Sequence, residues 1–304
     1  MTNIIISLIP IVIIFLILGI AVGITKLAKK GLPWNIKKRN PFTKDFLRGP
    51  GQSILKQVDD LKFDLLSLLL QLIILPLLVL IMPLINYALT NQKLSQFNIF
   101  LYGLILVAFL IFIFVRLYQK MKVYQQTQLG YEGEVAVGQE LNQLMLRGFH
   151  VYHDFPADGF NIDHIVVGNT GAFAVETKAR SKPTSDNRKN DARVEYDGKT
   201  LKFPHWVETK PIEQANRQAK WLKTWLSSAV GETVFVSPVL AIPGWFVKQT
   251  AAADTYIYNG KSPERLFPRV KHPSLNEQMI KRICHQLDAK CRDIEPKAYK
   301  ENKK

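Results

Sequence analysis

The chain has 304 residues, 47% of them hydrophobic, and a formal net charge of +15 at pH 7. This length suits one domain of ordinary size together with a further part. The only two cysteines are Cys284 and Cys291, which excludes a disulfide framework and favours a reducing compartment such as the cytoplasm. His285 lies beside Cys284, but without a CxxC pair this spacing does not favour a metal site.

Three stretches near the N-terminus contain no charged residue: 4–24, 65–89 and 97–115. Each reaches the length of about 18 to 20 apolar residues that crosses a bilayer. A cleaved signal peptide is the alternative for the first stretch, but it lacks a basic n-region and a small-residue cleavage site. The sequence therefore predicts a membrane region, residues 1–122, with three transmembrane helices and the lipid bilayer as a partner.

The basic residues around these stretches predict their orientation. Ten Lys and Arg side chains lie in the loop 25–64, whereas the short loop after the second stretch has only Lys93. Arg116, Lys120 and Lys122 follow the third stretch. By the positive-inside rule, the N-terminus lies outside the inner (plasma) membrane and everything after residue 116 lies in the cytoplasm. The basic loop is expected to lie on anionic headgroups, with attraction of nucleic acid as the alternative.

The soluble part opens with a predicted helix. Val137, Leu141 and Leu144 recur at helical spacing, and Gly148 ends the run. Glu134 precedes Val137 by three residues and so shares the buried stripe. It is either a partner of the helix dipole or a carboxylate directed at a site.

A predicted β-hairpin follows, in the stretch NIDHIVVGNTGAFAVETKA of residues 161–179. With Asn169 and Thr170 as the loop, Gly168 lies opposite Gly171, and the same register places Asp163 opposite Glu176. Lys178 shares the side of Glu176, because side chains alternate with a period of two along a strand. The hairpin thus brings two carboxylates and an ammonium group to one face.

Two carboxylates opposed across strands repel each other unless a cation lies between them. Mg²⁺ is typically held by one or two carboxylates and by substrate phosphate. The functional interpretation of the hairpin is therefore a divalent metal site. The alternative is a surface hairpin with a Glu–Lys pair facing solvent.

The remaining elements complete a layered α/β pattern. A second hairpin is predicted over 193–203 around Asp197-Gly198, and a helix begins near Pro211. In that helix Gln214 and Gln218 head a face that ends in tryptophans; glutamines on a solvated first turn are the alternative. Strands at about 233–245 and 255–260 and a basic amphipathic helix from Asn276 follow. The predicted fold is a mixed sheet flanked by helices, with a domain over 128–270 and a C-terminal helix and tail over 271–304.

Four motifs carry a resemblance to a known family: Gly130-Tyr-Glu-Gly-Glu134, Asn161-Ile-Asp-His164, Gly171 to Lys178, and Gln214 to Gln218. They resemble the nuclease-related domain (NERD) family, over about residues 128 to 245. That family is similar to the PD-(D/E)xK restriction-endonuclease-like fold and is presumed to process nucleic acid. One departure is Ile162, which stands where the motif has proline.

The resemblance implies roles for six residues. Asp163 and Glu176 would be ligands of Mg²⁺ or Mn²⁺, and Lys178 would position or activate the attacking water. Glu134 would be an auxiliary acid, and Gln214 and Gln218 would orient the substrate.

Three functional hypotheses follow. The first is a membrane-anchored, metal-dependent nuclease that acts on DNA, or on RNA, at the cytoplasmic face. The second is a catalytically inactive, tethered nucleic-acid-binding or scaffold protein, in which Arg180, Lys182, Arg188, Lys189 and Arg193 contact phosphates. The third, a channel or transporter, is disfavoured because no predicted span contains a charge. The oligomeric state stays open.

Overall fold

The computed structural model describes residues 41–182, 192–270 and 273–296, together with a few residues between 16 and 27. Most of the first predicted span, 4–24, and of the basic insertion lies outside the described residues. Contacts divide the chain into two units, one formed by 1–36 and 57–126 and the other by 37–56 and 127–304. The predicted limits of 128–270 and 271–304 stay a prediction.

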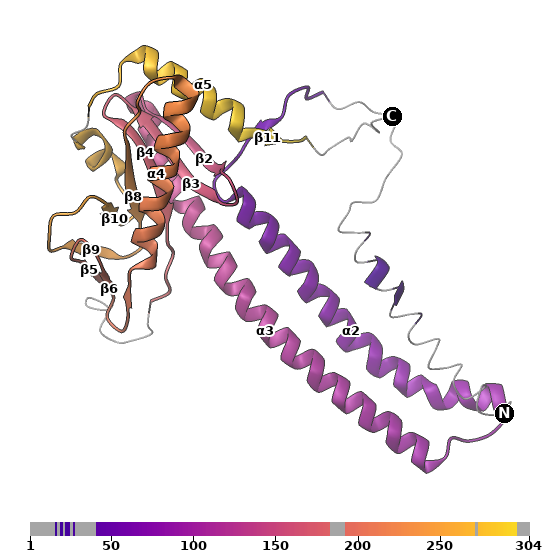
Figure 1. The fold of residues 1–304 in the computed structure, drawn as a ribbon. Helices are drawn as coiled ribbons and strands as arrows, with labels where there is room; N and C mark the ends of the chain where they lie inside the picture. Colours follow the sequence, from indigo (N-terminus) through magenta and orange to yellow (C-terminus); the bar gives the residue numbers. More distant parts are fainter. Residues whose placement is uncertain are drawn as a thin grey trace. The chain divides into compact units, whose positions relative to one another are not determined.

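The first unit is built from two long helices, α2 (Gln52–Thr90) and α3 (Gln96–Asn142) (Figure 1), and each of them continues into the second unit. Helix α2 contains the second predicted span, and α3 contains the third. Within the described residues these are the two helices long and apolar enough to cross a membrane. Most side chains of their apolar stretches are exposed. The structure thus supports two apolar helices, and not the three transmembrane helices that the sequence predicts.

Helix α3 differs from the prediction of a span followed by a separate helix. It runs without a break to Asn142, continues as the 3₁₀ turn η1 (Gln143–Arg147), and ends at Gly148, whose φ is 80°. The connecting stretch 116–133 contains no proline and is rich in long unbranched side chains. Such residues lose little freedom in a helix, so nothing in this stretch ends it.

The main sheet of the second unit has five strands in the order β10-β8-β4-β3-β2. Strands β2 (His150–Pro156), β3 (Asn161–Gly168) and β4 (Gly171–Thr177) are antiparallel neighbours. Strands β8 (Val236–Ala241) and β10 (Tyr256–Tyr258) extend the sheet in parallel with β4. The carboxyl ends of β4, β8 and β10 therefore lie along one edge.

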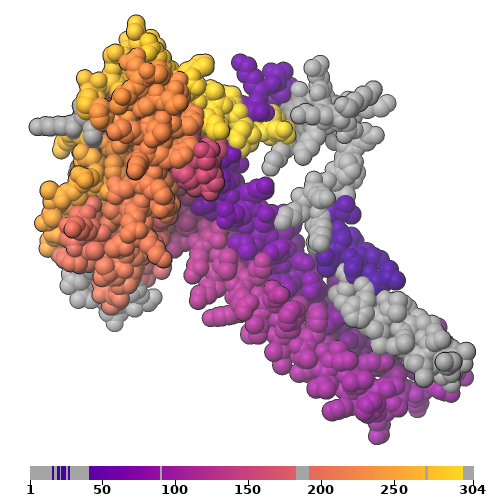
Figure 2. Space-filling model, viewed as in Figure 1, coloured from indigo at the N-terminus to yellow at the C-terminus, as the bar shows by residue number. Residues whose placement is uncertain are grey.

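Both faces of this sheet are covered. Helices α4 (Lys210–Val230) and α5 (Glu277–Cys291) lie against one face and form a core with it around Ile165, Leu222 and Ile283 (Figure 1). Figure 2 shows the orange side chains of α4 beside the yellow side chains of α5. The C-terminal part of α3 and the short turns η2 (Pro263–Arg265) and η3 (Phe267–Arg269) enclose a second core on the opposite face. The predicted mixed α/β fold is confirmed.

A second sheet has the strand order β7-β6-β5-β9. Its hairpin of β5 (Arg193–Tyr196) and β6 (Leu201–Lys202) confirms the predicted turn, in which the Asp197 carboxylate accepts from the backbone N–H of Lys199 and Thr200. Strands β7 (Val207–Glu208) and β9 (Phe246–Gln249) complete it. The sequence did not predict β9, because its four residues carry no clear alternation.

A third, two-stranded sheet ties the segment before α2 to the end of the chain. Strand β1 (Phe46–Leu47) pairs with β11 (Arg292–Ile294), which follows α5 directly. The backbone N–H of Arg48 also donates to the carbonyl of Cys291. Residues on the N-terminal side of α2 are thus structural members of the second unit.

Candidate active site

The site begins at the hairpin of β3 and β4, whose register is the predicted one. Gly168 lies opposite Gly171, and the pairing continues to His164 opposite Val175. Extending this register by one position would place Asp163 opposite Glu176, beyond the last recorded pair. The Glu176 side chain is only 1% exposed, which contradicts the alternative of a surface hairpin facing solvent.

Both carboxylate oxygens of Glu176 have a partner. One forms an ion pair with the amino group of Lys178, whose side chain stays partly exposed. The other accepts a hydrogen bond of 2.5 Å from Nε2 of Gln218 on α4. Helix α4 thus fixes Glu176 from one side, and Lys178 connects it to solvent.

Asp163 is half-buried beside this pair, and its Oδ2 accepts a hydrogen bond of 2.7 Å from the backbone N–H of Thr177. Burial, followed by the charges of Glu176 and Glu134, raises the pKa of Asp163 well above its ordinary value. The Thr177 hydrogen bond and the charge of Lys178 act in the opposite direction. Burial is the largest of these effects, so loss of solvation, more than repulsion by the neighbouring carboxylates, raises the pKa of Asp163.

Glu134 approaches from α3 and is 6% exposed. The glycine before it allows this approach, since a Cβ at Gly133 would lie 2.7 Å from the Cβ of Ala179. Burial, then the charges of Asp154 and Glu176, raises the pKa of Glu134 from 4.5 to about 8, and the charge of Lys178 opposes this rise. Glu134 is therefore a proton-holding acid near neutral pH.

The two predicted glutamines differ. Gln218 is buried, and its Nε2 also donates to the carbonyl of Asn161, while its Oε1 is buried without a partner among the described residues. Gln214 is half-buried, and its side chain forms no hydrogen bond with another described residue. The structure thus brings Gln218, but not Gln214, into contact with the acids.

Comparison with protein families decides the identity of this part of the chain. Residues 129–243 match the family model described as a nuclease-related domain. This stretch is a nuclease-related domain. Neither the search of curated proteins nor the search of solved structures returned a match. A match to a nuclease-related domain implies nucleic acid as the substrate or partner.

A network that the sequence did not predict supports the nuclease-related domain from outside the matched residues. Asp154 is 2% exposed, and its Oδ2 accepts from the N–H and Oγ of Ser53 and from Nη1 of Arg48. Its Oδ1 accepts from Nδ2 of Asn161, whose carbonyl in turn accepts from Gln218. Hydrogen bonds thus connect the segment before α2 with Glu176.

Asp154 also interrupts the regular pairing of β2 and β3. Its φ is 49°, in the left-handed region, and the strand pairs on either side of it are His153 with His164 and Phe155 with Ile162. A charged residue inside the apolar strand HVYHDF was the one available signal. Its partners Arg48 and Ser53 lie too far away in sequence to be paired with it by any local pattern.

The histidine of the Asn-Ile-Asp-His motif belongs to the core. His164 lies within 2.9 Å of His153 between their Nδ1 atoms, and Nε2 of His153 lies 3.0 Å from Oδ1 of Asn142. Because Oδ1 only accepts, the proton of His153 is on Nε2, and its Nδ1 accepts from His164. Burial lowers the pKa of both rings, that of His153 to about 4. His164 is therefore a neutral packing residue and not a ligand in this site.

The donor set of the nuclease-related domain suits a hard divalent cation. Oxygen atoms are the preferred ligands of Mg²⁺. The ion retains several waters and is usually bound by only one or two carboxylates of the protein. Among the described residues no group of three or more His, Cys, Asp or Glu side chains is placed to hold a metal ion. The two carboxylates Asp163 and Glu176 fit this open kind of site, and the raised pKa of Asp163 shows that positive charge would stabilise it.

Proposed function

We propose that this protein is a membrane-anchored, metal-dependent nuclease that hydrolyses phosphodiester bonds of DNA, or of RNA. The observation that carries the proposal is the buried Glu176, bound by Lys178 and Gln218, next to Asp163 with its raised pKa. A protein that only bound nucleic acid would gain nothing from burying opposed acids. Two acids and a lysine are the groups that phosphodiester hydrolysis uses.

Asp163 and Glu176 would hold Mg²⁺, or Mn²⁺, through carboxylate oxygens. Such an ion stabilises charge on phosphate oxygens and lowers the pKa of bound water. Gln218 fixes the direction of Glu176, and through Asn161 it joins the site to the rest of the sheet.

Lys178 provides the mobile positive charge of the site. Its side chain is 26% exposed, whereas that of Glu176 is 1% exposed, so the ammonium group lies where solvent and substrate enter. From the ion pair with Glu176 its ammonium group would stabilise negative charge that develops on the phosphate. Glu134, with a pKa of about 8, holds a proton close to the other acids at neutral pH.

Membrane attachment is supported by α2 and α3, and a cytoplasmic site by the basic residues on their flanks. A reporter enzyme fused after Lys304 should be active only as a cytoplasmic form. Activity of a periplasmic reporter at this position would contradict the orientation.

One observation favours the alternative of an inactive, tethered binding protein. The ion pair between Lys178 and Glu176 occupies an oxygen that the metal would use. A carboxylate oxygen has more than one lone pair, so the ion pair and a metal can share it. Cleavage activity separates the two functions.

The direct test is incubation of the full-length protein in detergent with linear, circular and single-stranded DNA and with RNA. We expect cleavage with Mg²⁺ or Mn²⁺, none with EDTA, and a large loss in Glu176→Gln. The exposed Glu132→Gln, on the same helix turn as Glu134, is the matched control and should retain activity. Tight binding without cleavage by the wild type would contradict the nuclease and favour the binding protein.

A further inference from the structure

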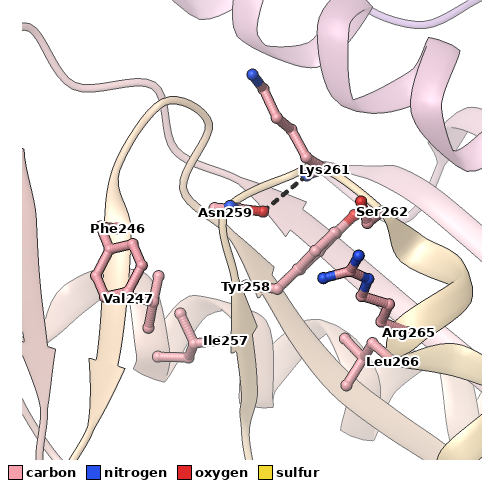
Figure 3. A pocket seen from close by; sticks show the side chains of 9 residues that line it. All are labelled: Phe246, Val247, Ile257, Tyr258, Asn259, Lys261, Ser262, Arg265 and Leu266. Atoms are coloured by element: carbon pink, nitrogen blue, oxygen red, sulfur yellow. Dashed lines mark hydrogen bonds between the residues drawn. The ribbon is translucent and has the colours of Figure 1, made fainter.

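A pocket of about 310 Å³ lies beside the end of β10 (Figure 3). Residues of β9, of β10 and of the segment leading through η2 line it. All of them follow residue 243, so the pocket lies outside the part of the chain that matches the nuclease-related domain. Its chemistry is therefore a property of this chain's own sequence.

One wall of the pocket is apolar and aromatic. Phe246, Val247 and Ile257 form it, and the Phe246 side chain is 62% exposed (Figure 3). The guanidinium carbon of Arg193 lies 5.7 Å from the centre of the Phe246 ring. An exposed ring beside a cation is suited to stacking against a flat, negatively charged ligand.

Another side of the pocket is cationic. In Figure 3 Arg265 lies across Tyr258 from Phe246, while Lys261 lies next to Asn259 with its amino group directed away from the other labelled side chains. Both cations are exposed, and neither forms an ion pair with any carboxylate of the described residues. Oδ1 of Asn259 accepts from the N–H of Lys261, and the left-handed Ser262 (φ 53°) turns the chain back, so the loop holds a defined conformation.

The pocket shares a sheet edge with the acids. Tyr258 pairs with Ala241, and Ala241 pairs with Thr177, all in parallel strands. Two strand spacings of about 4.8 Å separate β10 from β4, so the pocket begins roughly 10 Å from Glu176 and Lys178 along the carboxyl edge. That distance corresponds to about three nucleotides of a stacked strand, at about 3.4 Å each.

Backbone contacts continue along this edge. The N–H of Lys178 donates to the carbonyl of Ala241, and the N–H of Ile242 donates to that of Tyr258. A Cβ at Gly133, beside Glu134, would lie 3.6 Å from Pro243, and a Cβ at Gly260, beside Lys261, would lie 3.5 Å from Pro243. Helix α3 beside Glu134 and the loop beside Lys261 thus both pack against Pro243.

We propose that this pocket binds a single-stranded segment of the nucleic-acid substrate, about three nucleotides from the bond that is cleaved. A base stacks on Phe246, and the phosphates beside it contact Lys261 and Arg265. The segment is single-stranded because an aromatic ring can stack only on a base that is not already paired within a duplex stack. This inference rests on the proposed nuclease function and names the form of its substrate.

The test measures binding without cleavage. Full-length protein in detergent and EDTA is titrated with fluorescein-labelled oligodeoxythymidylate of about 12 nucleotides, and anisotropy is recorded at several salt concentrations. We expect Phe246→Ala to weaken binding about tenfold or more. Phe246→Leu retains apolar volume but does not stack like an aromatic ring, so it should weaken binding similarly. Phe246→Trp retains an aromatic ring and should bind the oligonucleotide about as tightly as the wild type.

The charge variants have a separate signature. Lys261→Gln combined with Arg265→Gln should weaken binding and reduce the slope of log K against log salt by about 1.4, since each lost phosphate contact accounts for about 0.7 on single strands. Lys248→Gln is the control. Lys248 is an exposed cation on β9, the strand that carries Phe246, but it is paired with Glu195. It should leave both affinity and slope near their wild-type values.

The outcomes separate this inference from the nuclease proposal. If the wild type cleaves nucleic acid while all pocket variants bind the oligonucleotide as tightly as it does, the pocket proposal is wrong and the nuclease stands. An equal effect of Lys248→Gln would also overturn it, as a general charge effect. If the wild type neither binds nor cleaves, both proposals fail.

Discussion

Glu134→Gln should stabilise the protein strongly at pH 8 and by only about 1 kcal/mol or less at pH 5. The buried carboxyl has a pKa of about 8, against an ordinary value of 4.5. Below pH 4.5 it is protonated in both the folded and the unfolded state. Between pH 4.5 and 8 the unfolded chain releases this proton while the folded chain retains it, so unfolding becomes progressively more favourable as the pH rises.

The size of the effect follows from the two pKa values. At about 1.4 kcal/mol for each tenfold change in proton affinity, the rise to about 8 corresponds to at most roughly 5 kcal/mol of lost stability at high pH. Gln is neutral and of similar size, so the variant avoids this loss. For a unit of this size 1 kcal/mol shifts the melting temperature by about 2–4 °C, so the expected gain at pH 8 is up to about 10–20 °C.

The assay is thermal unfolding of the full-length protein in detergent and EDTA at pH 5 and at pH 8. Glu132→Gln removes an exposed charge from the same helix turn and should change neither midpoint by more than a few degrees. An equal gain for Glu134→Gln at both pH values would refute the reasoning, because at pH 5 the unfolded carboxyl is only partly ionised and less than about 1 kcal/mol of the loss is present. So would the absence of any gain at pH 8.

Three further outcomes are expected. Lys178→Ala should reduce single-turnover cleavage about 10²- to 10³-fold while oligonucleotide affinity stays near the wild-type value, and full cleavage would exclude a catalytic role. Asp163→Asn should weaken Mn²⁺ binding in calorimetric titration while the fold survives, and unchanged affinity would rule out this ligand. Arg48→Met should lower the free energy of unfolding by about 3–5 kcal/mol, because it leaves the buried Asp154 carboxylate without its cation. Arg292→Met, which removes an exposed pair, should cost at most about 1 kcal/mol in the same denaturation experiment, and equal losses would refute the role of burial.

Local patterns in the sequence predicted most of the second unit. The hairpin around Asn169, the helix starting near Pro211 and the helix after Asn276 each carry their own turn or capping residues. Asn276 accepts from the N–H of Met279, as a helix N-cap does. Such signals involve residues a few positions apart, so they can be recognised without knowing the fold.

The parts that the sequence did not predict depend on distant contacts. Arg48 and Asp154 are 106 positions apart, and Arg48 and Asp293 are 245 apart. The helical spacing did place Glu134 on the buried stripe, and the structure confirms its burial; the close packing of Gly133 against Ala179 is the part that depends on a distant contact. The hairpin pattern predicted which acids share a face, but only the packed structure shows that α4 closes over Glu176.

The segment around Arg48 also changes how this unit can be separated from the helices. Residues 37–56 and 127–304 form one unit, so the apolar hairpin between them is an insertion within a domain rather than an anchor attached to its end. Ile54 lies 3.9 Å from where a Cβ at Gly130 would be, so the two boundaries of the insertion are close in space. A chain shortened to begin at residue 128 would lose Arg48 and Ser53, the partners of Asp154 Oδ2. Residues 41–56 joined to residue 127 by a short glycine-rich loop would keep them, and that rearranged chain is the form of this domain expected to fold in water.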